Sequence, residues 1–160
     1  MDRLGTLDAE FLLVEDERSP MHIGGVGIFS GPAPGLDDLR ALVAGKVHRI
    51  GRYRQVVKSV PLELGRPIWV DDPHFDPAHH IHAIALPEPH DDDALSELTG
   101  VLMSQRLDRE RPLWELWLVE GLPRNRWALV CKVHHCMVDG IAGVGILEAL
   151  LDPDPDAPVA

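Results

Sequence analysis

The pattern of apolar and polar positions predicts six strands, over residues 22–29, 52–60, 66–72, 80–87, 113–121 and 127–135. It also predicts three helices, over residues 37–50, 91–105 and 141–150. The first two helices open with aspartates and carry an apolar stripe at helical spacing. The third has Glu148 as its only charge, which is typical of a buried helix. This order of elements predicts an α+β fold, an α/β sandwich with a mixed sheet.

The composition is that of a folded, acidic domain. Of the 160 residues, 45% are hydrophobic, and 26 acidic against 15 basic residues give a net charge of −11. We expect one globular domain with a sizeable core. We expect no nucleic-acid partner, because such binding depends on neutralising phosphates with cations. Residues 151–160 are rich in Asp and Pro without apolar periodicity, which predicts a linker.

The sequence lacks the features of a membrane-spanning or secreted chain. It has no run of 18 apolar residues, and its acidic N-terminal stretch lacks the apolar run of a signal peptide. Cys131 and Cys136, if both lie on the last predicted strand, are on opposite faces, so we expect no disulfide between them. Two cysteines without a disulfide fit a reducing compartment, and we therefore expect a cytoplasmic location.

The stretch HHCMVDG holds the strongest candidate chemistry in the chain. On a strand over residues 127–135, His135 ends an apolar row, and His134 lies on the opposite face. An imidazole in an apolar setting stays neutral near pH 7, as a general base must. Asp139 could orient this base, but it is also placed to cap the helix that follows.

From the pattern alone, three interpretations of the two histidines stay open: a catalytic pair, a metal site, or the structural end of a strand. A metal site is disfavoured, because adjacent strand residues point to opposite faces and no third ligand stands at a suitable spacing. Four further histidines fall in a loop-to-strand region and are expected to be solvated rather than metal ligands; they are His74, His79, His80 and His82.

HHCMVDG resembles the H-H-x-x-x-D-G signature of the chloramphenicol acetyltransferase-like acyltransferase superfamily. Two more stretches narrow the choice to the bacterial wax ester synthase/diacylglycerol acyltransferase family. LDAEFLLVEDERSPMHIGGVGIF resembles the family's opening, and RLDRERPLWELWLVEGL resembles its P-L-W segment. The resemblance covers essentially the whole chain. It implies the N-terminal domain of the superfamily fold, a mixed β-sheet flanked by helices.

The resemblance also implies a role for each motif residue. His135 matches the general base, and His134 matches its less critical neighbour. Asp139 matches the aspartate that holds the loop's shape, and Gly140 matches the glycine that permits a tight turn. Weaker candidates for substrate contacts come from the P-L-W segment: Pro112, Leu113 and Trp114.

Family members are much longer than this chain and have two similar halves. We therefore expect residues 1–150 to be the N-terminal acyltransferase domain and residues 151–160 to be an interdomain linker, with the C-terminal half as a missing partner. The implied reaction is acyl transfer from long-chain acyl-CoA to diacylglycerol, or to a long-chain alcohol to give a wax ester. No cofactor is expected, since acyl-CoA is a substrate. The lipid substrates imply peripheral association with the inner face of the plasma membrane or with lipid droplets.

Two alternatives to this activity remain at the level of sequence. The chain could be a truncated, non-catalytic folding or partner-binding unit, and an isolated domain is expected to be inactive or weakly active. It could also be another acyltransferase with the same motif, such as a condensation domain.

A basic stretch at residues 46–58 interrupts the acidic sequence; its cations are Lys46, Arg49, Arg52, Arg54 and Lys58. These cations would suit CoA phosphates or anionic lipid headgroups. The interpretation we favour is structural: a helix C-terminus whose dipole attracts cations, continued on a solvated strand.

Overall fold

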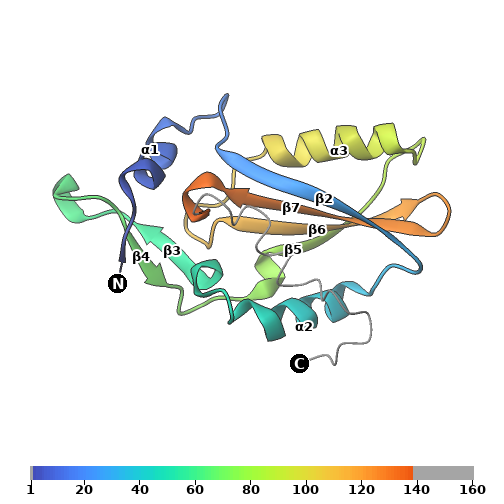
Figure 1. The fold of residues 1–160 in the computed structure, drawn as a ribbon, viewed down its shortest axis with the longest axis horizontal. Coiled ribbons are helices and arrows are strands. Elements are labelled where there is room, and N and C mark those ends of the chain that lie inside the picture. The colour runs from blue at the N-terminus through green and yellow to red at the C-terminus, as the bar shows by residue number, and fades with distance from the viewer. Residues whose placement is uncertain (1, 139–160) are drawn as a thin grey trace.

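The fold is built on two β-sheets, which the computed structural model describes within residues 2–138 (Figure 1). The strands are β1 (Asp2–Arg3), β2 (His22–Ser30), β3 (Gln55–Lys58), β4 (Ile68–Asp71), β5 (Ile81–Ala85), β6 (Trp114–Leu122) and β7 (Arg126–His134). The larger sheet has the order β2-β7-β6-β5; β5 and β6 are parallel and the other neighbours antiparallel, so the sheet is mixed. The smaller, antiparallel sheet has the order β1-β4-β3.

Three α-helices lie within the described residues: α1 (Thr6–Val14), α2 (Leu36–Val47) and α3 (Asp92–Ser104). Helix α3 runs along one face of the larger sheet and α2 along the other, while α1 lies near the end of β7 (Figure 1). Short 3₁₀ helices are η1 (Gly51–Arg54), η2 (Pro61–Glu63), η3 (Pro77–His79) and η4 (His135–Met137). Within residues 2–138, no helix has the length and apolar character needed to cross a bilayer.

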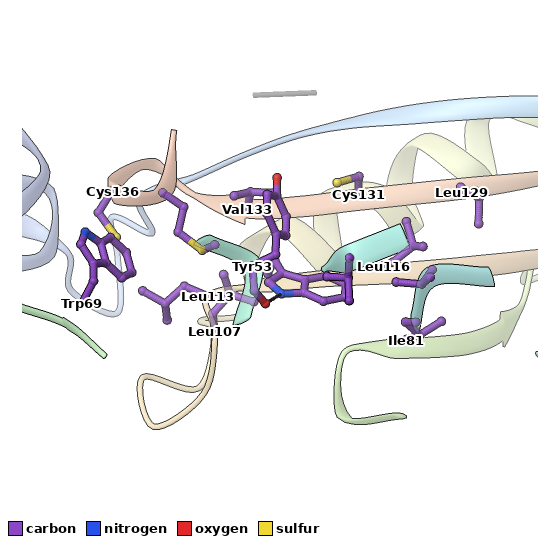
Figure 2. Close-up of a cluster of buried hydrophobic side chains, with 14 of the residues drawn as sticks. Tyr53, Trp69, Ile81, Leu107, Leu113, Leu116, Leu129, Cys131, Val133 and Cys136 are labelled. Atoms are coloured by element: carbon purple, nitrogen blue, oxygen red, sulfur yellow. Dashed lines mark hydrogen bonds between the residues drawn. The ribbon is translucent and has the colours of Figure 1, made fainter. Parts of the chain in front are cut away.

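Strand β7 separates two hydrophobic cores, because its side chains alternate between the faces of the sheet. Leu129, Cys131 and Val133 lie in the larger core, which also takes in residues of α1, α2 and the smaller sheet (Figure 2). Ala128 and Val130 lie in the second core, together with the leucines of α3. The histidine motif begins at the last residue of β7 and therefore lies at the boundary between the two cores.

The sequence pattern predicted most of this architecture. All six predicted strands are present as β2 to β7, and the helices predicted over residues 37–50 and 91–105 are present as α2 and α3. The pattern did not predict α1 or the short β1, and residues 51–54 form a 3₁₀ turn where a strand was predicted to begin. The helix predicted over residues 141–150 and the linker over 151–160 lie outside the described residues.

The expectation that Cys131 and Cys136 lie on opposite faces of one strand is wrong. Strand β7 ends at His134, and both thiols lie in the larger core, where both are free (Figure 2). Burial raises the pKa of each thiol to about 12, so neither forms a thiolate at neutral pH.

Candidate active site

The two motif histidines lie where the central strand β7 stops. The N–H of His134 donates to the carbonyl of Leu113 at 3.0 Å, on the β6 side. The N–H of His135 donates to the carbonyl of Met21 at 2.8 Å, on the β2 side. Since the strand has neighbours on both sides, the backbone of the pair is fixed from both directions.

The side chain of His134 is locked in the interior. The residue is 1% exposed, and its Nδ1 accepts the N–H of Cys136 at 3.1 Å, which caps η4. Because Nδ1 is the acceptor, the neutral ring carries its proton on Nε2. Burial lowers the pKa of His134 to about 4, against the attraction of the Glu15 carboxylate, so the ring is neutral at pH 7.

The side chain of His135 has a different environment. The residue is partly exposed and belongs to η4 rather than to the strand. Its ring stacks on Phe11 of α1, with the ring centroids 4.7 Å apart and an angle of 26° between the planes. Sequence parity predicted that the two histidines would differ, with His135 in the apolar setting. The two rings do differ, but the buried ring is that of His134, because β7 ends at this residue and His135 lies in η4. The structure adds that α1 forms one wall beside the ring of His135.

A buried carboxylate that the sequence did not suggest lies behind the motif. The side chain of Glu15, the residue after α1, is 1% exposed. Its Oε2 accepts a hydrogen bond from Nη2 of Arg109 at 2.7 Å, and its Oε1 accepts the N–H of Met21 at 3.3 Å. Oε1 also lies 3.1 Å from Nε2 of His22 and 3.5 Å from Nε2 of His134.

The two contacts from Glu15 to imidazole nitrogens are electrostatic contacts rather than aligned hydrogen bonds, because neither Nε2 has a hydrogen-bond partner of acceptable geometry. Burial alone would raise the pKa of Glu15, but the hydrogen bonds from Arg109 and from the Met21 N–H, together with the nearby charges, hold the pKa below its usual value. The carboxylate is therefore ionised at neutral pH.

All three P-L-W residues are buried, and Leu113 belongs to the larger core while also bordering a cavity. Trp114 is fully buried, and its Nε1 donates to the carbonyl of Tyr53 at 2.9 Å, so it acts in packing. Pro112 is also buried. Leu113 lines an open cavity of about 660 Å³ between α1, the β3–β4 hairpin and the loop before β6. The other lining residues are Ala9, Leu12, Leu13, Val57, Lys58, Ser59, Val60, Gly65, Arg66, Pro67, Arg109 and Glu110.

Several cations of the basic stretch have partners within the fold, which fits a structural role, although Arg52 and Arg54 lie in η1 rather than on the solvated strand that was expected. Arg52 lies 4.4 Å above the ring of Trp69, and Lys58 donates to Glu110 at 2.7 Å. Arg54 lies above the ring of Phe75, and Lys46 is buried.

The expectation that the four histidines of the loop-to-strand region are solvated is wrong for His80. This residue is 3% exposed, stacks on Trp114, and has its Nδ1 3.0 Å from the carbonyl oxygen of Trp114. The ring completes a buried aromatic cluster, which the loop-like local sequence does not reveal. His74 and His79 are exposed, as expected, and His82 is partly buried. No cluster suited to a metal ion occurs among residues 2–138. Asp139 and Gly140 lie outside the described residues.

Comparisons with known proteins identify the family. The family described as the wax ester synthase/diacylglycerol acyltransferase catalytic domain matches residues 4–160. The probable diacylglycerol O-acyltransferase tgs1 of Mycobacterium tuberculosis is 45% identical over 154 residues, which are 95% of this chain and 33% of that protein. The related tgs3 is 41% identical over 152 residues, 94% of this chain and 56% of that protein. The chain thus spans about a third to somewhat over half of these relatives.

Solved structures agree. The wax ester synthase/diacylglycerol acyltransferase of Marinobacter aquaeolei VT8 is similar with a TM-score of 0.79 and 34% identity, covering 98% of this chain and 41% of that one. The starter condensation domain of rhizomide synthetase shares the fold, with a TM-score of 0.71 and 15% identity. The match covers 94% of this chain and 36% of the condensation-domain chain. The predicted chloramphenicol acetyltransferase-like architecture is therefore confirmed. The chain belongs to the wax ester synthase/diacylglycerol acyltransferase family of acyltransferase catalytic domains.

Proposed function

We propose that this chain supplies the histidine-bearing part of an O-acyltransferase that forms triacylglycerol from diacylglycerol and long-chain acyl-CoA. The observation that carries the proposal is the contrast between the two motif histidines. His134 has one ring nitrogen engaged by the N–H of Cys136 and the other buried. His135 is partly exposed beside α1, where a substrate hydroxyl can approach.

In the proposed reaction, His135 acts as a general base. A ring nitrogen accepts the proton of the acceptor hydroxyl while the oxygen attacks the thioester carbonyl. The tetrahedral intermediate then expels the CoA thiolate by breaking the C–S bond, and the imidazolium returns its proton to the thiolate. Proton transfer of this kind contributes about 10²–10⁴-fold to a rate. No covalent enzyme intermediate is required.

The substrate class is supported by the cavity next to α1. Its walls are mainly apolar, and the cations Lys58, Arg66 and Arg109 lie among its lining residues. Apolar walls suit long hydrocarbon chains. The mycobacterial relatives are named as diacylglycerol acyltransferases, which favours diacylglycerol as acceptor. The name of the Marinobacter enzyme also includes wax ester synthase, and a long-chain alcohol is therefore the second acceptor to test.

We further propose that residues 1–150 form the N-terminal domain and residues 151–160 a linker, and that Asp139 and Gly140 shape the motif loop. The chain spans a third of tgs1, so the remaining substrate contacts and the oxyanion donors are proposed to come from the rest of the enzyme.

The test uses two preparations: residues 1–160 alone, and a hybrid in which they replace the matching segment of tgs1. Each is incubated with palmitoyl-CoA and diacylglycerol, and both free thiol and triacylglycerol are measured. We expect the hybrid to be active and His135→Ala to reduce its rate by about 10²-fold or more. His74→Ala, at an exposed histidine, is the matched control and should leave the rate unchanged.

Three results would contradict the proposal. An active hybrid whose His135→Ala variant releases thiol at the same rate would exclude His135 as the base. Faster turnover with hexadecanol than with diacylglycerol would make wax ester the product. Faster turnover with an acyl group on a carrier protein than with acyl-CoA would favour a condensation-type reaction.

A further inference from the structure

Glu15 lies in the protein interior, where an ionised carboxylate is unfavourable. Its side chain is 1% exposed, and a buried charge is unfavourable unless charged or polar partners compensate for it. The local sequence VEDERSP is a polar stretch in which neighbouring acids are exposed. Only Glu15 of this stretch is buried, so tertiary contacts rather than local structure hold it there.

One oxygen of Glu15 ties the end of α1 to the loop before β6. Nη2 of Arg109 donates to Oε2 at 2.7 Å and also to the carbonyl of Leu12 at 2.8 Å. The guanidinium of Arg109 thus holds the carboxylate and one of the last carbonyls of α1 together, and Nη2 of Arg106 adds a longer contact to Oε2 at 3.5 Å. Helix α1 carries Phe11, the ring on which His135 stacks. The pair Glu15–Arg109 therefore fixes one wall of the candidate active site.

The other oxygen of Glu15 contacts two groups next to the motif turn, the N–H of Met21 and the ring of His134. Oε1 accepts the N–H of Met21 at 3.3 Å, and the carbonyl of Met21 accepts the N–H of His135 at 2.8 Å. Oε1 also lies 3.5 Å from Nε2 of His134. Because Nδ1 of His134 accepts the N–H of Cys136, Nε2 carries the proton of the neutral ring, which suits a neighbouring carboxylate.

We propose that Glu15 is a positioning residue for His135, acting together with Arg109. It holds α1 against the ring of His135, the Met21 segment against its backbone, and the ring of His134 one residue before it. This inference rests on the proposed function. Small displacements of a base lower the chemical step more than they lower binding, since proton transfer requires a narrow range of distances and angles.

The decisive variant is Glu15→Gln in the hybrid enzyme. The substitution keeps the shape and one acceptor oxygen but removes the charge and turns one oxygen into an N–H donor. We expect kcat to fall by about 10- to 100-fold, with a change of less than about threefold in KM for palmitoyl-CoA. Arg109→Met should reproduce the fall in kcat. The control is Glu10→Gln, an exposed glutamate on α1, which should change neither constant.

A second measurement does not depend on activity. In ¹⁵N-imidazole spectra of residues 1–160, His134 should give one unprotonated Nδ1 signal and one protonated Nε2 signal, and Glu15→Gln should shift both, while Glu10→Gln leaves them in place. If wild-type hybrid is inactive but these shifts occur, the proposed function fails and the contact from Glu15 to the motif stands.

Two outcomes would overturn the positioning role. In the first, Glu15→Gln has wild-type kcat and unchanged imidazole signals. In the second, its activity falls only in proportion to the folded fraction measured by circular dichroism, with kcat per folded molecule unchanged. The second outcome would make Glu15–Arg109 an ordinary structural ion pair.

Discussion

Acid should destabilise this fold through His134. Its ring is buried and accepts the N–H of Cys136 through Nδ1, so protonation places a charge in the interior and removes that acceptor. Burial lowers the pKa of His134 from 6.5 to about 4. Between these two pH values the unfolded chain binds a proton at His134 that the folded chain does not. The stabilisation is therefore complete above about pH 6.5 and is lost as the pH falls to about 4.

The magnitude follows from the two pKa values. Their difference, 6.5 minus about 4, is about 2.5 units, and one unit corresponds to about 1.36 kcal/mol, which gives a loss of about 3 kcal/mol. A domain of this size commonly has an unfolding free energy of about 5–15 kcal/mol, so the loss is a large share of the total. Burial also lowers the pKa of His22 and of His80, and both act in the same direction.

The variant His134→Gln isolates the contribution of this ring, since an amide oxygen can accept the N–H of Cys136 without titrating. Urea unfolding of residues 1–160 would be measured from pH 7.5 to pH 4. The wild-type chain should lose about 3 kcal/mol more than the variant over this interval. Parallel stability curves for the two proteins would refute the reasoning, because they would mean that the ring is protonated in the fold without cost.

Two pairs of substitutions test the packing. Gly24→Ala should destabilise the fold by about 2 kcal/mol or more, since the added carbon would collide with the backbone carbonyl of Cys131. Gly100→Ala, in open space on α3, should instead stabilise the fold by about 0.5–1 kcal/mol. Glu115→Ala should cost about 3–5 kcal/mol by leaving the ammonium of Lys132 buried without its carboxylate, and Lys132→Met should cost much less. Urea unfolding at pH 7.5 measures all four, and equal free energies within either pair would contradict the contact concerned.

The sequence predicted those elements that pack one regular face, or two alternating faces, against a hydrophobic core. Strand β7 is predictable because its alternating side chains face two different cores. Helix α1 was missed because its apolar residues do not form one buried stripe: Leu7 and Leu13 are exposed, whereas Ala9 and Leu12 are buried. Ala9 and Leu12 reach the larger core, and the contact from Glu15 to Arg109 fixes the end of the helix.

In the candidate site, too, the features that depend on neighbouring residues could be predicted, and those that depend on contacts distant in sequence could not. Parity along β7 predicted that His134 and His135 would differ, because that distinction depends on neighbouring residues. It gave the apolar setting to the wrong ring, since β7 ends at His134 and this ring is the buried one. The partners of Glu15 could not be predicted, since Arg109 lies 94 residues away in sequence. His80 was expected in solvent for the same reason: its ring is buried against Trp114, which lies 34 residues further along.

Strand β7 ends between the two histidines for a local physical reason. In a central strand, consecutive N–H groups point to opposite neighbours, and those of His134 and His135 do so, toward Leu113 and Met21. If the strand continued, the next N–H, of Cys136, would point to the β6 side again, but it donates to Nδ1 of His134 instead. That bond starts η4 and turns the ring of His135 away from the face that strand periodicity would give it. His134 thus ends the strand with its own side chain, which explains why a buried, neutral histidine directly precedes the proposed base.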